Sequence, residues 1–171
     1  MTDNDIDSAI YKQLVRQLTE IGLDIPVKAG FQPIKPGSED NMVMFFSINE
    51  RGHGWQGRNY NIQGQNANHQ ENLLSEKTYQ VQTVITQLGS YTANDIAAMV
   101  RMVINSLPFV TALRKQGIGV QRATDIRQPY IVNEHGDYEQ TISFDFNVTF
   151  KRSLFPDTAA ISALYPNLHR I

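Results

Sequence analysis

The chain contains no cysteine, and this absence removes several classes of site at once. Disulfide frameworks, thiolate zinc sites and cysteine nucleophiles are all excluded. The chain also lacks any apolar run that approaches the roughly 20 residues of a membrane-spanning helix. Its first residues, MTDNDIDSAIYKQLV, are acidic where a secretory signal would be basic, so we expect synthesis in the cytosol and no membrane partner.

The chain has little charge of either sign, with 15 Lys and Arg against 17 Asp and Glu and a net charge of −2. A protein that binds phosphates along a nucleic acid needs a basic surface, and the whole chain carries no such footprint. Residues 1–100 carry 7 basic and 11 acidic groups, net −4, whereas residues 101–171 carry 8 and 6, net +2. This asymmetry is too weak for long-range steering, but it would favour contact between opposite faces of two copies.

Amide side chains replace the missing charges, with 14 Gln and 13 Asn. Amides keep a surface hydrated, and they are buried against a partner at a smaller desolvation cost than charges. This composition suits a subunit of an assembly, although solubility alone explains it nearly as well. The length favours a single domain that spans residues 1–171.

Three segments have helical signals. The first runs from a cap at Asp7 or Ser8 to Gly22, with apolar residues spaced by three or four. The second begins at a capping box of Thr92 and Asp95 and ends at Pro108, and a short third helix stops at Gly117. Residues 24–40 contain three prolines and two glycines, which predicts an extended surface strap.

Strand signals occur at 41–50, at 77–89 and in two short segments within 118–134, where Pro129 favours a position near a sheet edge. The clearest strand is 138–152, YEQTISFDFNVTFKR, in which apolar and polar residues alternate over most of the length. A tight turn, NEHGD, precedes it and predicts a hairpin.

The predicted order is helix, strand, long loop, strand, helices and three antiparallel strands. This order favours an α+β fold in which an antiparallel or mixed β-sheet, with a long C-terminal β-hairpin, packs against two or three α-helices. A dinucleotide-binding fold would need strands and helices in regular alternation, which the last three strands interrupt.

Residues 49–64, NERGHGWQGRNYNIQG, are predicted to form a loop with four glycines, two arginines and the only tryptophan. No Lys-Ser or Lys-Thr and no amphipathic helix follow the glycines, so a phosphate-binding loop is excluded. The four histidines are scattered without metal-binding spacing, and His135 with Asp137 fits turn chemistry better than a metal site. No serine nucleophile motif is present.

The remaining interpretation of this loop is binding to another protein. Arg51, Trp55, Arg58 and Tyr60 are residue types that dominate protein interfaces, and the glycines let the loop follow a neighbour's surface. Two alternatives stay open: Trp55 folds back over its own sheet, or the aromatic and arginine side chains stack on single-stranded nucleic acid.

Two long segments carry a resemblance. YQVQTVITQLGSYTANDIAAMVRMVINSL is a strand, a glycine turn and a helix, and RQPYIVNEHGDYEQTISFDFNVTFKR is a hairpin with a long second arm. Together they resemble the tail terminator, or neck, proteins of tailed bacteriophages. The resemblance covers residues 75–152 best and the N-terminal helix loosely. In that family, α+β subunits form a ring, typically of six, that stops tail-tube polymerisation and docks head-completion proteins.

The resemblance implies a non-enzymatic virion protein without cofactor or metal, made in the cytoplasm of the bacterial host. Its implied partners are other copies of itself, the tail tube protein, head-completion or neck proteins, and double-stranded DNA that passes through the ring without sequence-specific binding. Arg51, Trp55, Arg58 and Tyr60, with the edge strand near Tyr130, are the expected interface. Two other functions stay open: another tail tube or baseplate subunit, and a small metal-dependent hydrolase built on His135 and Asp137.

Overall fold

The computed structural model describes residues 1–30, 41–63, 66–85, 90–128, 130–132, 138–140, 142–155 and 157–159. The predicted α+β fold class is confirmed, because helices and a mixed sheet both occur. In chain order the elements are α1 (Asp3–Glu20), β1 (Val27–Ala29), β2 (Asn41–Gln63), β3 (Asn66–Ile85), α2 (Ala93–Ile104), α3 (Leu107–Arg114), β4 (Gly119–Val120), β5 (Tyr130–Val132), β6 (Tyr138–Gln140), β7 (Ile142–Leu154) and β8 (Asp157–Ala159).

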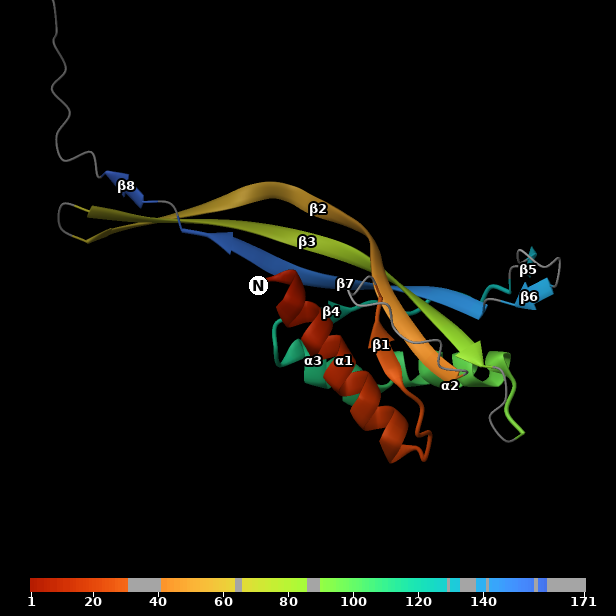
Figure 1. The fold of residues 1–171 in the computed structure, drawn as a ribbon. Coiled ribbons are helices and arrows are strands. Elements are labelled where there is room, and N and C mark those ends of the chain that lie inside the picture. The colour runs from red at the N-terminus through yellow and green to blue at the C-terminus, as the bar shows by residue number, and fades with distance from the viewer. Residues whose placement is uncertain are drawn as a thin grey trace, which may run out of the picture.

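The main sheet has the strand order β1-β2-β3-β7-β4, with β8 paired to β3 off this path. All of its pairings are antiparallel except that of β1 with β2. Figure 1 shows the three helices on the same side of this sheet, while β2 and β3 continue far beyond them. A second, two-stranded sheet holds β5 and β6.

The hydrophobic core lies between the sheet and the helices. Alternate residues of β7, from Phe144 to Phe150, are buried, as the alternating sequence predicts. Tyr79 of β3 stacks on Phe146 with ring centroids 5.6 Å apart, and Phe45 of β2 lies 6.1 Å from Tyr79. The helices contribute apolar stripes to the same core: Ile6, Ile10, Leu14 and Leu18 from α1, Ile96, Val100 and Val103 from α2, and Phe109 and Leu113 from α3.

Two helices begin with the same capping box. The box at Thr92 and Asp95 is confirmed, with each side chain bonded to the other residue's backbone N–H. The predicted start of α1 at Asp7 or Ser8 is wrong, because Thr2 and Asp5 form an equivalent box one and a half turns earlier. The predicted stops at Gly22 and Gly117 are confirmed, since both glycines have positive φ, 78° and 79°.

The segment predicted as a surface strap is partly a buried strand. Leu23, Ile25 and Val27 are buried in the core, and residues 27–29 pair in parallel with residues 43–45 of β2. Their apolar side chains therefore outweigh the turn signal of Pro26. Residues 31–40 of the predicted strap lie outside the described part of the chain.

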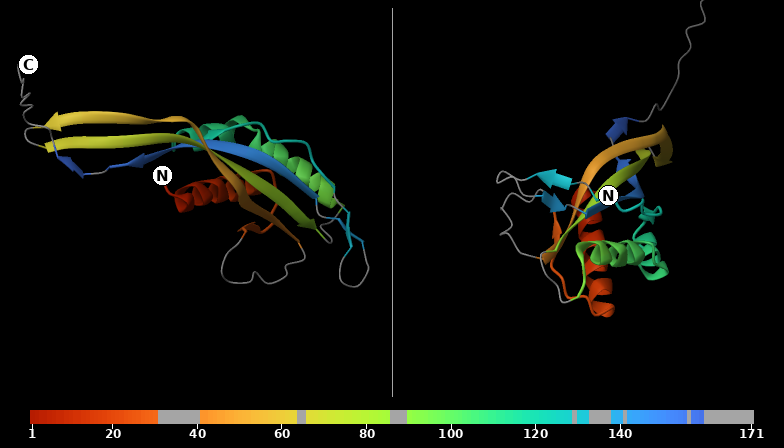
Figure 2. Two further views of the ribbon diagram at one scale, coloured as in Figure 1. Left: turned by 90° about the horizontal axis from the view of Figure 1, so that it is seen from above. Right: turned by 90° about the vertical axis from the view of Figure 1, so that its right-hand side faces the viewer.

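The predicted loop at 49–64 is also wrong for its described residues, because β2 runs without interruption from Asn41 to Gln63. It pairs with β3 down to the register of Gln63 with Asn66, with irregularities between Ser47 and Asn49 and between His53 and Gly57. Together, β2 and β3 form one long hairpin. The left view in Figure 2 shows this hairpin extended far beyond the helices.

The C-terminal strands follow the prediction in part. Strands β5 and β6 form the predicted hairpin, although its turn at 133–137 lies outside the described residues. The long alternating strand β7 pairs with β3 and β4. In the segment before β5, Arg127 forms an isolated bridge with Ser143 of β7. Among the described residues the second short strand, β5, is one of the two strands of the small sheet, so it is an edge strand as predicted.

Candidate assembly interface

The outer part of the long hairpin, residues 51–63 of β2 and 66–76 of β3, is called the arm here. The end of β7 pairs along its base, from Glu76 with Thr149 to Glu71 with Leu154. Farther out, β8 pairs with residues 66–68 of β3. Figures 1 and 2 show that the arm extends past the helices, so its faces are available to other molecules.

A buried carboxylate ties the arm to the body on the face away from the helices. Glu76 is 3% exposed and accepts hydrogen bonds from side chains of three other segments. Arg51 of β2 donates from Nε at 2.9 Å and from Nη2 at 2.5 Å, Gln121 beyond β4 donates at 2.7 Å and Asn147 of β7 donates at 3.3 Å, while His53 Nε2 lies 3.1 Å away.

A second charged cluster ties the arm to α1 on the helix-covered face. Lys77 is 4% exposed, and its Nζ lies 2.9 Å from Asp3 and 3.6 Å from Glu50. Arg152 of β7 binds both carboxylates, with Nη2 at 2.5 Å from Asp3 and Nε at 2.8 Å from Glu50. Charge-assisted bonds of this kind are among the stronger polar contacts, so the first turn of α1 is fixed against the base of the arm.

These contacts lower the pKa values of the three carboxylates, Asp3, Glu50 and Glu76. The hydrogen bond from His53, aided by Gln121 and Arg51, lowers the pKa of Glu76 against the opposing effect of burial. Arg152 is the main cause of the lowered pKa values of Asp3 and Glu50. The two carboxylates in turn raise the pKa of Arg152. All three acids are therefore held in their charged form at neutral pH.

Trp55 stands out from the arm. It lies in the irregular stretch between His53 and Gly57, beside Gly54, which has a φ of 70°. Positive φ is a conformation that glycine adopts without a steric penalty, and it bends the strand at this point. The Trp55 side chain is 99% exposed, so the alternative in which it folds back over its own sheet is wrong. An indole this exposed is available to another molecule.

The other predicted interface residues fall into different surroundings. Arg51 is occupied with Glu76, which makes it a support of the arm. Arg58 is 62% exposed and lies 3.4 Å from Glu71. Tyr60 pairs with His69 on the arm, and Tyr130 pairs with Gln140 in the small sheet, but the side chains of both tyrosines lie outside the described part of the structure. Thus four of the five residues gather on the arm and Tyr130 does not.

Sequence reasoning missed several exposed apolar residues near the arm. Ile48, Leu74, Leu154 and Phe155 are all exposed. Leu154 is in register with Glu71, and Leu74 lies opposite His53. The apolar pairs Leu73-Leu74 and Leu154-Phe155, each among polar residues, were the available signal.

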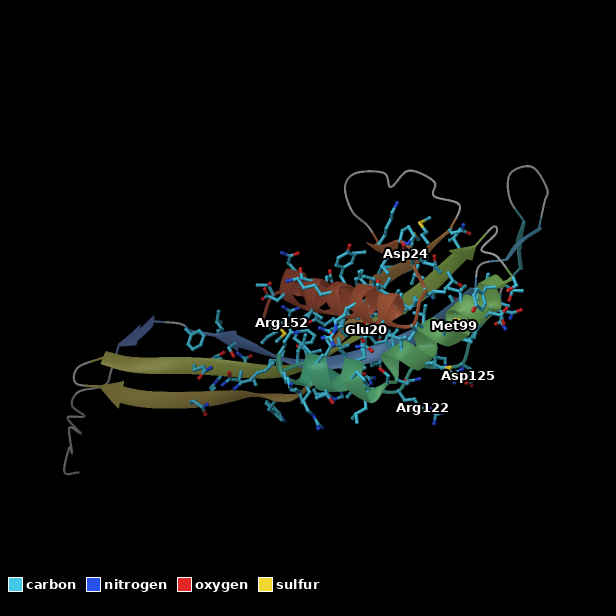
Figure 3. The ribbon with its side chains drawn as sticks, turned by 90° about the horizontal axis from the view of Figure 1, so that it is seen from below. Glu20, Asp24, Met99, Arg122, Asp125 and Arg152 are labelled. Atoms are coloured by element: carbon cyan, nitrogen blue, oxygen red, sulfur yellow. The ribbon has the colours of Figure 1, made fainter. Side chains whose placement is uncertain are left out.

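An apolar groove lies on the helical side, with a volume of about 310 Å³. Its walls come from the last turns of α1, from α2 and from the start of α3: Gln17, Glu20, Ile21, Met99, Met102, Val103, Ser106 and Pro108. Met102 is 72% exposed at its rim. Figure 3 shows Glu20 and Met99 in this region, while Arg152 lies towards the opposite end of α1.

The described residues contain no group of three or more His, Asp or Glu side chains placed to hold a metal ion. His135 and Asp137, the basis of the hydrolase alternative, lie outside them. No single helix in the described part of the chain is long and apolar enough to cross a membrane. Helices α2 and α3 taken together have the length and composition of a span, but they are bent by 49°.

A known protein of solved structure shares the fold of this chain. No curated protein sequence matches the chain. Among solved structures it is similar to the sheath/tube terminator of an extracellular contractile injection system, PVC, in the extended state. The TM-score is 0.58 at 14% identity, with 100% of this chain covered, and the chain spans 64% of that protein's length. The likeness concerns the fold.

The sequence also matches the profile of the E217 gateway protein gp29 over residues 5–160, which is most of the chain. The predicted resemblance to phage tail terminator and neck proteins is confirmed by this match together with the fold. The chain belongs to the family of the E217 gateway protein gp29.

Proposed function

We propose that this protein is a structural component of a phage tail that ends the tail tube. The observation that carries the proposal is the agreement of the family match over residues 5–160 with the fold of a sheath/tube terminator. The whole chain, as one domain, would form a ring of about six copies on the last layer of the tube. Its location would be the virion, between tail and head.

The arm supports this proposal in physical terms. A rigid extension would help a subunit to reach its neighbour in a ring, and charged clusters on both faces of the sheet hold the base of the arm. It presents Trp55 and Arg58 well away from the core. Aromatic and arginine side chains supply much of the binding energy in protein interfaces. The predicted interface of Arg51, Trp55, Arg58 and Tyr60 therefore remains our proposal, with Arg51 acting through the anchoring of the arm.

The proposed partners follow from the position of the ring. One face would contact the tail tube protein, and the other would contact head-completion or neck proteins. Double-stranded DNA would pass through the ring without sequence-specific binding, which suits a chain of net charge −2. We propose that the protein performs no catalysis and holds no cofactor, because its role is served by surfaces alone.

Polymerising tail tube protein provides the test. Adding the purified chain during polymerisation should place ring-shaped density at one end of each tube in electron micrographs. Mean tube length should fall as the ratio of chain to tube protein rises, because each ring removes one growing end. A reaction with an equal mass of serum albumin controls for crowding.

Two results would count against the proposal. Tubes with bare ends and unchanged length would show that the chain does not stop growth. Long stacks made by the chain alone would instead favour the alternative of a tube or baseplate subunit, since a terminator presents only one face on which the tube can end.

A further inference from the structure

Among the described residues, the exposed Trp55 on the arm and the apolar groove at the end of α1 match each other in size and chemistry. We propose that Trp55 of one copy inserts into the groove of the next copy, where Met99, Met102 and Ile21 receive it. This contact would be the repeating joint of the ring, so the inference rests on the proposed function.

The size and chemistry of the groove fit one large aromatic side chain. Its volume of about 310 Å³ is at the lower limit of ligand pockets, which hold small molecules from roughly 300 Å³ upwards. Its uncharged polar members, Gln17 and Ser106, bond to each other, with Ser106 Oγ donating to Gln17 Oε1 at 3.0 Å. The exposed Met102 has a flexible side chain, and methionine sulfur makes favourable contacts with aromatic rings.

Charge at the two surfaces is complementary. The groove lies at the C-terminal end of α1, where the helix dipole is negative and the last turn contains no basic residue. Glu20 lines the groove and pairs with Arg16 at 2.7 Å, and the exposed Asp24 follows it. On the arm, Trp55 is followed by Arg58, which is 62% exposed. In the proposed joint, Arg58, which lies three residues along the chain from Trp55 and 3.4 Å from Glu71, would come near the acidic Glu20 and Asp24.

The occupant must come from another copy of the chain. The base of the arm is fixed to Asp3, at the start of α1, and the groove is lined by Glu20, at its end. The 18 residues of this helix span about 27 Å at 1.5 Å per residue. The arm leads away from that end in Figure 1, so Trp55 cannot reach the groove of its own chain.

The two surfaces are different, so the joint is heterologous. Each copy would offer its arm to one neighbour and its groove to the other, which produces a ring when the rotation closes. The arrangement also predicts complementation. A copy with a damaged groove retains a working arm, and a copy with a damaged arm retains a working groove.

Trp55 is the only tryptophan, so its fluorescence reports directly on the joint. For the unaltered chain, selectively excited indole emission should shift to shorter wavelength as concentration rises and rings form. Met102→Asp should remain monomeric with emission typical of exposed indole, although Trp55 is unchanged. Thr111→Asp, which places the same charge at an exposed position of α3 outside the groove, should behave like the unaltered chain.

Mixing decides the case. Trp55→Ala lacks the side chain that fills the groove, so it should form no ring. It also has no other tryptophan, so it adds no indole emission to the mixture. Adding it to Met102→Asp should produce particles of two chains and a blue shift of the Met102→Asp indole, because the intact arm meets the intact groove. Circular dichroism of each variant confirms that it is folded.

Each other outcome overturns the inference. Rings that form while the Trp55 emission stays unshifted would show that Trp55 does not enter the groove. Normal rings from Met102→Asp would show the same, and in both cases the ring would form through other contacts. If the mixture shows neither a shift nor pairs, the two surfaces do not meet. If the unaltered chain stays monomeric with exposed Trp55 yet still caps tubes, the proposed function stands and the arm meets a different partner.

Discussion

At the scale of single residues, Glu76 does most to hold the arm in place. It joins β2, β3, β7 and the segment after β4 through one buried carboxylate. A buried acceptor of this kind is costly unless every donor around it is present. Its environment meets that condition, because arginine, histidine and two amides surround it.

Glu76→Gln is expected to loosen the arm and to lower the midpoint of thermal unfolding. The amide preserves the shape but removes the charge that Arg51 and His53 bind. Hydrogen exchange measured by mass spectrometry should be faster in the variant than in the unaltered protein, and the increase should be larger in residues 51–56 and 71–76 than in α2. Equal exchange across the arm in both proteins would show that the carboxylate does not anchor it.

Acid should destabilise the protein through the same clusters. The folded-state pKa values of Asp3, Glu50 and Glu76 are lowered, so these carboxylates bind protons more weakly in the folded chain than in the unfolded one. Their stabilising effect is complete above the unfolded values, about 4, and is lost as the pH falls through the lowered folded values. Urea unfolding between pH 7 and pH 3 should therefore show stability falling mainly below about pH 4. The fall should be smaller in Glu76→Gln, and an identical slope in both proteins would contradict this assignment.

Tyr79 links the sheet to α1 by a single hydroxyl. Its Oη donates to Asp7 at 2.5 Å, and burial together with this acid raises the pKa of the phenol. Tyr79→Phe keeps the ring stack on Phe146 but removes the bond to a charged acceptor. We expect a loss of about 1.5 to 3 kcal/mol in the free energy of unfolding. Urea denaturation measures it, and a loss below about 0.5 kcal/mol would fall outside the range for such bonds.

At the scale of elements, the sequence predicted those with strong local patterns. Alternation in 142–150 identified β7, and the Thr92 capping box identified α2. The same box is present in the sequence at Thr2 and Asp5, so the start of α1 carries as clear a local signal as that of α2. Alternation of Leu23, Ile25 and Val27 likewise indicated the buried segment before and within β1.

The arm was not predictable in the same way. Its residues between 51 and 72 are mostly glycine, amides and charges, which disfavour strands when judged locally. Pairing with the other half of the hairpin, with β7 and with β8 supplies the order that local propensity lacks. The residues of the candidate interface were therefore identified by type, while their placement on a rigid arm required the structure.

The arm as an element should be needed for assembly but not for folding. Trp55→Ala combined with Arg58→Ala removes two exposed side chains and leaves Glu76 and its partners intact. We expect loss of the ring with an unchanged circular dichroism spectrum. Tyr11→Ala combined with Arg114→Ala removes an exposed aromatic and an exposed arginine from the helices and serves as the matched control. Normal rings from the arm variant would remove Trp55 and Arg58 from the interface.

At the scale of the whole molecule, the described residues combine a helix-covered face of the sheet with an exposed arm and an apolar groove. The helices close one side of the sheet, the arm projects past them, and an apolar groove opens at the end of α1. A closed ring of identical subunits needs two different, complementary surfaces on each subunit. The same two surfaces form an open polymer when the rotation between neighbours does not close. Whether the rotation between neighbouring copies closes a ring therefore distinguishes a terminator from a subunit that forms open polymers.

The most direct test of the ring is light scattering on a size-exclusion column over a hundredfold range of protein concentration. The proposal predicts a discrete mass of about six chains that does not grow further as concentration increases. A monomer at every concentration, or a series of ever longer polymers, would contradict a closed ring formed by this chain alone.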